Sequence, residues 1–338
     1  MDAPSARPPS PSRTASDIFK SNAWLPNPHQ LPNQPLPSIT SPCCARNMMN
    51  SSARPLANSS SPNSTNRTTD MLQQYFGFTR LPFTKDIPSD QLFLANGQSE
   101  LCARLDYLLK DRGLGLVTGE TGSGKSTTLR RFTAQLDPNR HFVLYLANPF
   151  LGLSGIYRDL LTTLGHETPF GKPKAVARIR SAFHELLHTK HRLPVVILDE
   201  AHLFPTTVFE PLRLLFSTEM DSQSLGVLLL VGQPELRRTL RLTPYEAFYQ
   251  RLTTHYHLPP LDLAQTIAYI RHHIQLAEYQ AGPLFADDAL ARIYENTKGV
   301  PRLINRLCTT ALLVTAADNR QIIEESTIRK AISELDQG

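Results

Sequence analysis

The stretch Gly119-Glu120-Thr121-Gly122-Ser123-Gly124-Lys125-Ser126 decides the fold of this 338-residue chain. It fits the pattern G-x-x-x-x-G-K-[ST] and lies between a strand-like apolar run, Leu114–Thr118, and a helical pattern, Ser126–Gln135. Glycines in this context let the backbone curl around a phosphate with its N–H groups pointing inward, where the helix dipole adds positive potential. The sequence therefore predicts a phosphate-binding loop. The expected nucleotide contacts are Gly119, Glu120, Thr121, Gly122, Ser123, Gly124, Lys125, Ser126 and Thr127.

Two acids that follow the apolar run Val195–Leu198 supply the second half of such a site. Lys125 is expected to neutralise the β- and γ-phosphates of ATP, and the Ser126 hydroxyl is expected to coordinate Mg²⁺. Asp199 would hold Mg²⁺ through water, and Glu200 would orient and deprotonate the attacking water. An acid pair at a strand end is also common as a solvated helix cap. Its place about 75 residues after the loop favours a Mg²⁺-dependent ATP hydrolase.

A third apolar run, Gly226–Val231, leads to the polar residue Gln233. A polar side chain at this strand tip could hydrogen-bond the γ-phosphate or the attacking water, which makes Gln233 a candidate for the catalytic set. The alternative is an ordinary turn residue.

From Met71 onward, apolar runs of strand length alternate with amphipathic stretches, which is the pattern of parallel βαβ units. After Pro259-Pro260 only helical patterns follow. We therefore predict an α/β fold of the P-loop NTPase type, with a five-stranded parallel sheet in three αβα layers and a C-terminal helical lid. The expected strands are Leu114–Thr118, Phe142–Ala147, Pro194–Asp199, Gly226–Val231 and Thr254–Leu258. The expected helices are Ser126–Gln135, Leu153–Leu164, Ala175–Thr189, Val208–Ser217, Leu263–Tyr279, Ala286–Thr297, Pro301–Asp318 and Glu325–Leu335.

Composition divides the chain into a tail (residues 1–70), a nucleotide-binding core (71–258) and the lid (259–338). The tail holds 38 Pro, Ser, Asn and Thr residues and no Gly, so it has too little apolar surface to offset the entropy of ordering. We predict that it is disordered, although a start codon assigned too far upstream would explain the same composition. The tail carries +3 of the net charge of +5, so the folded part offers only weak general attraction for nucleic acid.

Neither a membrane helix nor a secretory leader is expected. No apolar run approaches the roughly 20 residues that span a bilayer, and the N-terminus has no apolar segment behind a basic start. The four cysteines, Cys43, Cys44, Cys102 and Cys308, form neither a disulfide framework nor a C-x-x-C zinc pattern. These features predict a cytoplasmic protein.

Together, these motifs resemble those of AAA+ ATPases. The segment Tyr75–Leu335 is similar to the ATPase domain of the ExeA type (general secretion pathway A), and also to the TniB- and TnsC-type ATPases that serve DNA transposition. The resemblance covers about 260 of the 338 residues. The matching residues are Tyr75–Phe78, Pro82-Phe83, Thr118–Ser126, Leu198–His202, Leu230–Leu236, Gly299–Arg302 and Asn305.

The resemblance implies roles for residues outside the two motifs. Arg302 would be a lid arginine that contacts the γ-phosphate in its own subunit, unless it only pairs with a nearby acid. ATP would lie between the subunits of a homo-oligomer, where an arginine finger from the neighbour stabilises the transition state. Arg251 is the first candidate for this finger, and Arg237 and Arg238 are the alternatives. The segment Tyr75–Phe83 would pack near the adenine or form simple core.

Three hypotheses remain for the process that ATP drives. An ATPase that assembles on DNA and recruits or regulates a transposase is favoured, because an ExeA-type secretion protein is expected to continue beyond Gly338 into a membrane helix and a peptidoglycan-binding region. The alternatives are a secretion-pathway ATPase that acts through a membrane partner, and a nucleotide-dependent oligomerisation switch. A strip of basic residues is expected to contact duplex DNA; the alternative is a solvated helix face. It consists of Lys172, Lys174, Arg178 and Arg180, with Lys190 and Arg192 as weaker members.

Several histidines also recur at suggestive spacing. His184, His188 and His191 lie three or four residues apart, and His272 and His273 are adjacent. Such spacing can hold zinc only with further fixed ligands, and no Cys or acid is obviously placed to join them. We expect these five residues on helix surfaces.

Overall fold

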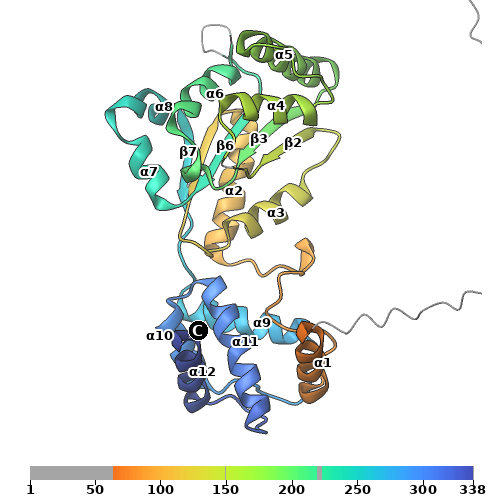
Figure 1. Cartoon of the computed structure of the whole chain (residues 1–338), viewed down its shortest axis with the longest axis vertical. Coiled ribbons are helices and arrows are strands. Elements are labelled where there is room, and N and C mark those ends of the chain that lie inside the picture. The colour runs from red at the N-terminus through yellow and green to blue at the C-terminus, as the bar shows by residue number, and fades with distance from the viewer. Residues whose placement is uncertain (1–63, 149, 219–222, 338) are drawn as a thin grey trace, which may run out of the picture. The chain divides into compact units, whose positions relative to one another are not determined.

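Five parallel strands form the central sheet, in the order β2-β3-β6-β1-β7 (Figure 1). The computed structural model describes residues 64–148, 150–218 and 223–337, so the predictions for residues 1–63 lie outside the described part. The predicted five-stranded parallel sheet is confirmed. Its strands are β1 (Leu114–Thr118), β2 (His141–Leu146), β3 (Leu193–Leu198), β6 (Val227–Gly232) and β7 (Leu252–His257). A small antiparallel pair joins β4 (Ser217–Thr218) to β5 (Gln223–Ser224).

Helices cover both faces of this sheet, which gives the three-layer αβα arrangement (Figure 1). One face is covered by α2 (Asn96–Asp111) and α3 (Lys125–Gln135). The helices that cover the other face are α4 (Leu153–Thr163), α5 (Lys172–His184), α6 (Phe209–Phe216), α7 (Pro234–Leu240) and α8 (Glu246–Gln250).

The sequence of β3 shows why this sheet is buried on both sides. Successive strand residues point to opposite faces. Val196 and Leu198 accordingly pack with α4–α8, whereas Val195 and Ile197 pack with α2 and α3. A continuous apolar run is typical of a strand that is covered on both faces. This burial fixes the strand tip, and therefore the acid pair that follows it.

A separate hydrophobic cluster, which we call the lid cluster, joins α1 (Ser64–Phe76) to the four C-terminal helices. Leu72 and Phe76 of α1 are buried in it, and the Tyr75 hydroxyl donates to the Arg320 carbonyl oxygen at 2.9 Å. The helix α1 begins at Ser64 and therefore starts within the tail predicted for residues 1–70. The C-terminal helices are α9 (Leu263–Leu276), α10 (Asp287–Thr297), α11 (Pro301–Ala317) and α12 (Glu325–Gln337).

The remaining differences from the predicted helices have local causes. The predicted set lacks α1, α2, α7 and α8; of these, α7 and α8 have only 7 and 5 residues, too few to show a helical period. By contrast, α2 does carry a readable signal, since Leu101 and Leu108 recur on its buried face. The α5 helix begins at Lys172, earlier than predicted, because Pro173 is favourable in a first turn. No helix in the described ranges is long and apolar enough to cross a bilayer.

Candidate nucleotide-binding site

The predicted loop and the predicted acid pair lie at the same edge of the sheet. Strand β6 lies between β1 and β3, and the register pairs Thr118 with Gly232 and Leu198 with Leu230. Because all three strands are parallel, the segments that follow them leave from one edge, where ligands bind in open α/β sheets. The sheet therefore brings the phosphate loop close to the acid pair.

The loop before α3 has the backbone of an anion cradle. Gly122 and Gly124 have φ angles of 83° and 96°, which side-chain-bearing residues rarely adopt. The α3 helix begins at Lys125, and Gly124 provides no side chain to cap it, so N–H groups of the first turn are left to an anion. The Ser123 hydroxyl is buried without a hydrogen-bond partner in the described chain. These features fit the phosphates of a nucleotide.

The Lys125 ammonium group is folded back onto this loop. It donates to the carbonyl oxygens of Gly119 and Glu120, at 2.7 and 2.9 Å. Burial lowers the pKa of Lys125 from its ordinary value, and the nearby carboxylates of Glu200 and Asp199 oppose that shift. The two acids therefore favour the charged form of the lysine, which is the form that binds phosphate.

Asp199 accepts hydrogen bonds from three neighbours. The hydroxyls of Ser126 and Tyr145 donate to its Oδ2, at 2.8 and 2.6 Å, and the backbone N–H of Glu200 donates to Oδ1 at 2.9 Å. The close approach of Ser126 to Asp199 matches the hydroxyl and carboxylate oxygens that hold Mg²⁺ beside a nucleotide. The described residues contain no group of three or more His, Cys, Asp or Glu able to hold a metal ion. In nucleotide sites, waters and phosphate oxygens supply most of the Mg²⁺ ligands.

Glu200 lies beside a histidine that also contacts the β6 tip. Its backbone is left-handed, with φ of 51°, and its Oε2 lies 3.5 Å from His202 Nδ1. The same Nδ1 lies 3.5 Å from the backbone nitrogen of Gln233. Glu200 lines the cavity described next, whereas the Gln233 side chain does not. The structure therefore places the backbone of Gln233 near His202 and its side chain outside the cavity lining.

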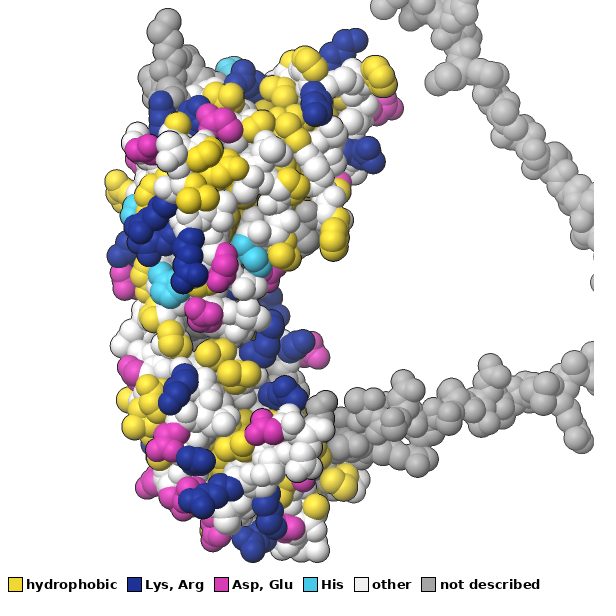
Figure 2. All heavy atoms as spheres, turned by 60° about the vertical axis from the view of Figure 1, so that its left-hand side comes forward, with side chains coloured by type: hydrophobic (Ala, Val, Ile, Leu, Met, Phe, Trp, Pro, Cys, Tyr) yellow, Lys and Arg dark blue, Asp and Glu magenta, His cyan; other side chains and the backbone are white. Residues whose placement is uncertain are grey.

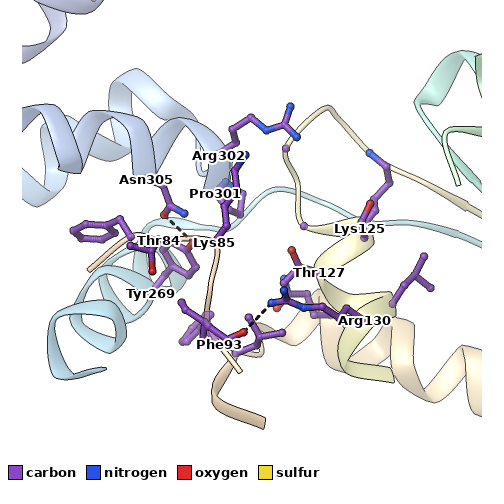
Figure 3. A pocket seen from close by; sticks show the side chains of 18 of the residues that line it. Thr84, Lys85, Phe93, Lys125, Thr127, Arg130, Tyr269, Pro301, Arg302 and Asn305 are labelled. Atoms are coloured by element: carbon purple, nitrogen blue, oxygen red, sulfur yellow. Dashed lines mark hydrogen bonds between the residues drawn. The ribbon is translucent and has the colours of Figure 1, made fainter. Parts of the chain in front are cut away.

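A cavity of about 1030 Å³ opens beside the loop (Figure 3). It lies between the α3 side, with Lys125, Thr127 and Arg130, and the lid side, with Tyr269 and Asn305. The predicted site residues that line it are Thr121, Gly122, Gly124, Lys125, Ser126, Thr127, Glu200 and Arg302. Those that do not line it are Gly119, Glu120, Ser123, Asp199, Gln233, Arg237, Arg238 and Arg251.

Several polar residues of this cavity were missing from the predicted site. Tyr145, Gln98 and Tyr269 line it, and the Tyr269 hydroxyl donates to Asn305 Oδ1 at 2.8 Å. Gln98 is buried, and its side-chain oxygen accepts from the backbone N–H of Ala95 at the start of α2. Only Tyr145 carried a usable signal, because it lies next to the end of a predicted strand.

Arg302 is the one arginine of the predicted set that reaches this loop. Its backbone N–H donates to the Gly122 carbonyl oxygen at 3.3 Å. Its side chain covers the same glycine, because a Cβ built on Gly122 would lie 2.5 Å from the Arg302 Cβ. The lid helix α11 therefore begins directly against the phosphate loop.

The predicted basic strip is only partly available to a ligand. Lys172, Lys174 and Arg178 are exposed on α5. Arg180 donates to the carbonyl oxygens of Leu214 and Ser217. Of the weaker members, Lys190 pairs with Glu185 at 2.9 Å and Arg192 lies over the Phe142 ring. Figure 2 shows a face of the molecule on which Lys and Arg side chains are interspersed with Asp and Glu.

The segment predicted to lie near the adenine belongs mostly to the lid cluster. Phe76 and Phe78 are buried there, whereas Phe83 also lines the cavity. Phe83 stacks on His273 at 5.1 Å between ring centres, and its backbone N–H donates to His273 Nδ1 at 3.2 Å. The surface position predicted for His273 is therefore wrong: its ring is buried and accepts a hydrogen bond as the neutral form. His184 and His188 are exposed as predicted.

We expect His273 to make the protein sensitive to acid. Burial, followed by the charges of His272 and Arg80, lowers the pKa of His273 to about 3. The unfolded chain then takes up a proton near the ordinary histidine pKa of about 6.5 while the folded chain does not. The free energy of unfolding therefore depends on pH through His273. It is unaffected by this group above about pH 6.5, and it falls by up to about 1.4 kcal/mol per pH unit from there toward pH 3.

Urea unfolding at about pH 7 and about pH 5 measures this effect. From pH 7 to pH 5, the free energy of unfolding of the wild-type protein should fall by about 2 kcal/mol more than that of His273→Gln. The exposed His188→Gln is the matched control and should leave the loss unchanged. Equal pH dependence in both variants would contradict a neutral, buried His273.

Comparisons with known proteins agree with the predicted class of protein. Residues 108–240 match the AAA domain family, which is the class that the fold and the phosphate loop define. General secretion pathway protein A of Aeromonas hydrophila is 35% identical over 272 residues, which are 78% of this chain and 48% of that protein. The chain thus spans about half the length of this curated relative. Both findings support the resemblance that the motifs predicted, to AAA+ P-loop ATPases of the ExeA-like type.

Solved structures support the fold. Cdc6p from Pyrobaculum aerophilum has a TM-score of 0.59 at 17% identity, covering 75% of this chain and 70% of that one. The ORC1 protein of Aeropyrum pernix, solved in complex with DNA, has a TM-score of 0.54 at 16% identity, covering 75% and 68%. At such identities the likeness concerns the α/β fold alone.

Proposed function

We propose that this chain hydrolyses ATP to ADP and phosphate in a Mg²⁺-dependent reaction. The observation that carries the proposal is the 2.8 Å contact between the Ser126 hydroxyl and Asp199, directly beside the glycine-bounded loop and Lys125. Loop, hydroxyl and strand-tip carboxylate together are the parts that a P-loop enzyme needs to hold a nucleotide and its metal. When bound, Mg²⁺ would offset negative charge on the phosphates.

Each side chain then has a defined task. The N–H groups of the loop and the Lys125 ammonium group bind the β- and γ-phosphates. Ser126 and, through water, Asp199 would hold Mg²⁺. Glu200 faces the same cavity and takes the proton of the attacking water. Arg302 lies over the loop at Gly122, where its guanidinium group would contact the γ-phosphate.

We further propose that the active form is a homo-oligomer. Arg237, Arg238 and Arg251 do not line the cavity of their own chain, which is compatible with a role on a neighbour's nucleotide. Arg251 directly precedes β7 and is our first candidate for the arginine finger, with Arg237 and Arg238 as the alternatives.

For the process that ATP drives, we propose assembly on duplex DNA, with a transposase as the regulated partner. Its support is the exposed group Lys172, Lys174 and Arg178, together with a fold shared with an ORC1 protein solved in complex with DNA. A second candidate, energising a secretion pathway through a membrane partner, is favoured by the 35% identity to general secretion pathway protein A.

Steady-state ATP hydrolysis with and without duplex DNA separates these candidates. Assembly on DNA predicts that duplex DNA raises the rate of ATP hydrolysis at least about 3-fold. It also predicts that the apparent affinity for DNA falls by about one log unit per log unit of salt concentration for each phosphate contacted. Lys174→Glu should weaken DNA binding, whereas Lys110→Glu, on the exposed side of α2, should not. A rate and an assembly state that are both indifferent to DNA would contradict DNA assembly and favour the secretion role.

A further inference from the structure

Tyr145 contacts the predicted metal ligand Asp199 from outside the two nucleotide motifs. It lies near the end of β2, next to β3, with Tyr145 opposite Ile197 in the register. Its hydroxyl donates to Asp199 Oδ2 at 2.6 Å, shorter than the 2.8 Å bond from Ser126 to the same oxygen. Its ring is 53% exposed, so the residue contributes little to the core. The hydrogen bond to Asp199 is its main specific contact.

The tyrosine is the donor in this contact. A phenol hydroxyl is protonated at neutral pH and donates a hydrogen bond to the carboxylate oxygen, which accepts it. Hydrogen bonds to a charged acceptor are among the stronger ones in proteins.

The three hydrogen bonds fix the orientation of the Asp199 side chain. The backbone N–H of Glu200 holds Oδ1, while Ser126 and Tyr145 share Oδ2. Of these donors, Ser126 is itself assigned to Mg²⁺. When the cation binds, the Glu200 N–H and Tyr145 are the two donors left to hold the carboxylate. A carboxylate oxygen has two lone pairs, so the bond from Tyr145 is compatible with a further partner on Oδ2.

We propose that Tyr145 is a positioning residue for Mg²⁺: its hydroxyl holds the Asp199 carboxylate in the orientation that faces Ser126. The inference rests on the proposed function, because it assigns Ser126 and Asp199 to the cation. A carboxylate that is already oriented binds a cation more tightly, since less side-chain freedom is lost on binding. Tyr145 thus sets the Mg²⁺ affinity of the nucleotide complex.

The test is Tyr145→Phe in the full chain, which removes the hydroxyl and keeps the ring. Binding of a fluorescent ATP analogue is measured while Mg²⁺ is titrated, and again in excess EDTA. The Mg²⁺ concentration at half-saturation should rise about 10-fold, as expected for the loss of one charge-assisted hydrogen bond. The affinity in EDTA should change less than about 2-fold, because the phosphate contacts are untouched.

Tyr107→Phe is the matched control. Tyr107 is exposed on α2 and does not line the nucleotide cavity, so this variant should keep the wild-type Mg²⁺ titration. An unchanged or lower Mg²⁺ concentration at half-saturation in Tyr145→Phe would overturn the inference. An equal loss of affinity for the ATP analogue with and without Mg²⁺ would also overturn it, because that result indicates a structural role. A wild-type protein whose nucleotide binding ignores Mg²⁺ would instead contradict the proposed function itself.

Discussion

Lys125→Ala is expected to weaken ATP binding about 100-fold. The ammonium group is buried beside the phosphate loop, within hydrogen-bond reach of the carbonyl oxygens of Gly119 and Glu120. When a nucleotide is present, the same group can turn to the β- and γ-phosphates and form charge-assisted hydrogen bonds of about 1.5–3 kcal/mol each. Two such bonds correspond to a factor of about 100 or more in affinity.

Equilibrium binding of a fluorescent ATP analogue measures this loss. The control is Lys110→Ala, which removes an exposed lysine at the end of α2 and should keep the wild-type affinity. Thermal unfolding without nucleotide shows whether the variant folds. A folded Lys125→Ala protein that loses less than about 10-fold would count against the phosphate loop as the nucleotide site.

The second large effect is expected for Glu200→Gln, which should lower ATP turnover at least about 100-fold and leave ATP binding intact. The amide cannot accept the proton of the attacking water, and general base catalysis typically contributes about 10²–10⁴-fold. The side chain lines the cavity but makes no hydrogen bond to Lys125 or to the loop in the described structure, so the substitution leaves the hydrogen bonds of Lys125 and of the loop in place.

Release of phosphate under saturating ATP is the measurement, in parallel with nucleotide binding. Glu334→Gln removes an exposed carboxylate from α12 and serves as the control that keeps the wild-type rate. If the active form is an ATP-bound oligomer, Glu200→Gln should also accumulate it on a sizing column in the presence of ATP. Wild-type turnover in Glu200→Gln would remove this residue from the reaction.

The sheet and the two nucleotide motifs could be predicted because local pattern alone determines them. The glycines of the loop have no other common use between a strand and a helix, and Val195–Leu198 is too continuously apolar to be a surface strand. The acid pair follows from that strand end. Within each motif, neighbours in the sequence are also neighbours in the site, whereas the contact between the motifs, from Ser126 to Asp199, spans 73 residues and follows from the parallel sheet.

The other side of the cavity depends on contacts between distant segments, which local pattern does not reveal. Tyr145 meets Asp199 across 54 residues, and Phe83 meets His273 across 190. His273 looked like a surface residue because its neighbour His272 is polar and its burial comes from Phe83, on another segment. The helix α1 was missed for the same reason, since its partners lie at the far end of the chain.

The lid cluster has an architectural consequence. Because α1 comes before the nucleotide-binding core in the chain and α9 comes after it, the core is covalently an insertion within the helical cluster. The backbone leaves the cluster after Ala95 and returns to it at Leu261. Shortening the chain from either end would therefore expose apolar side chains of the opposite end. Phe83 and Arg302, which lie on opposite sides of the core in the sequence, both belong to segments of this cluster.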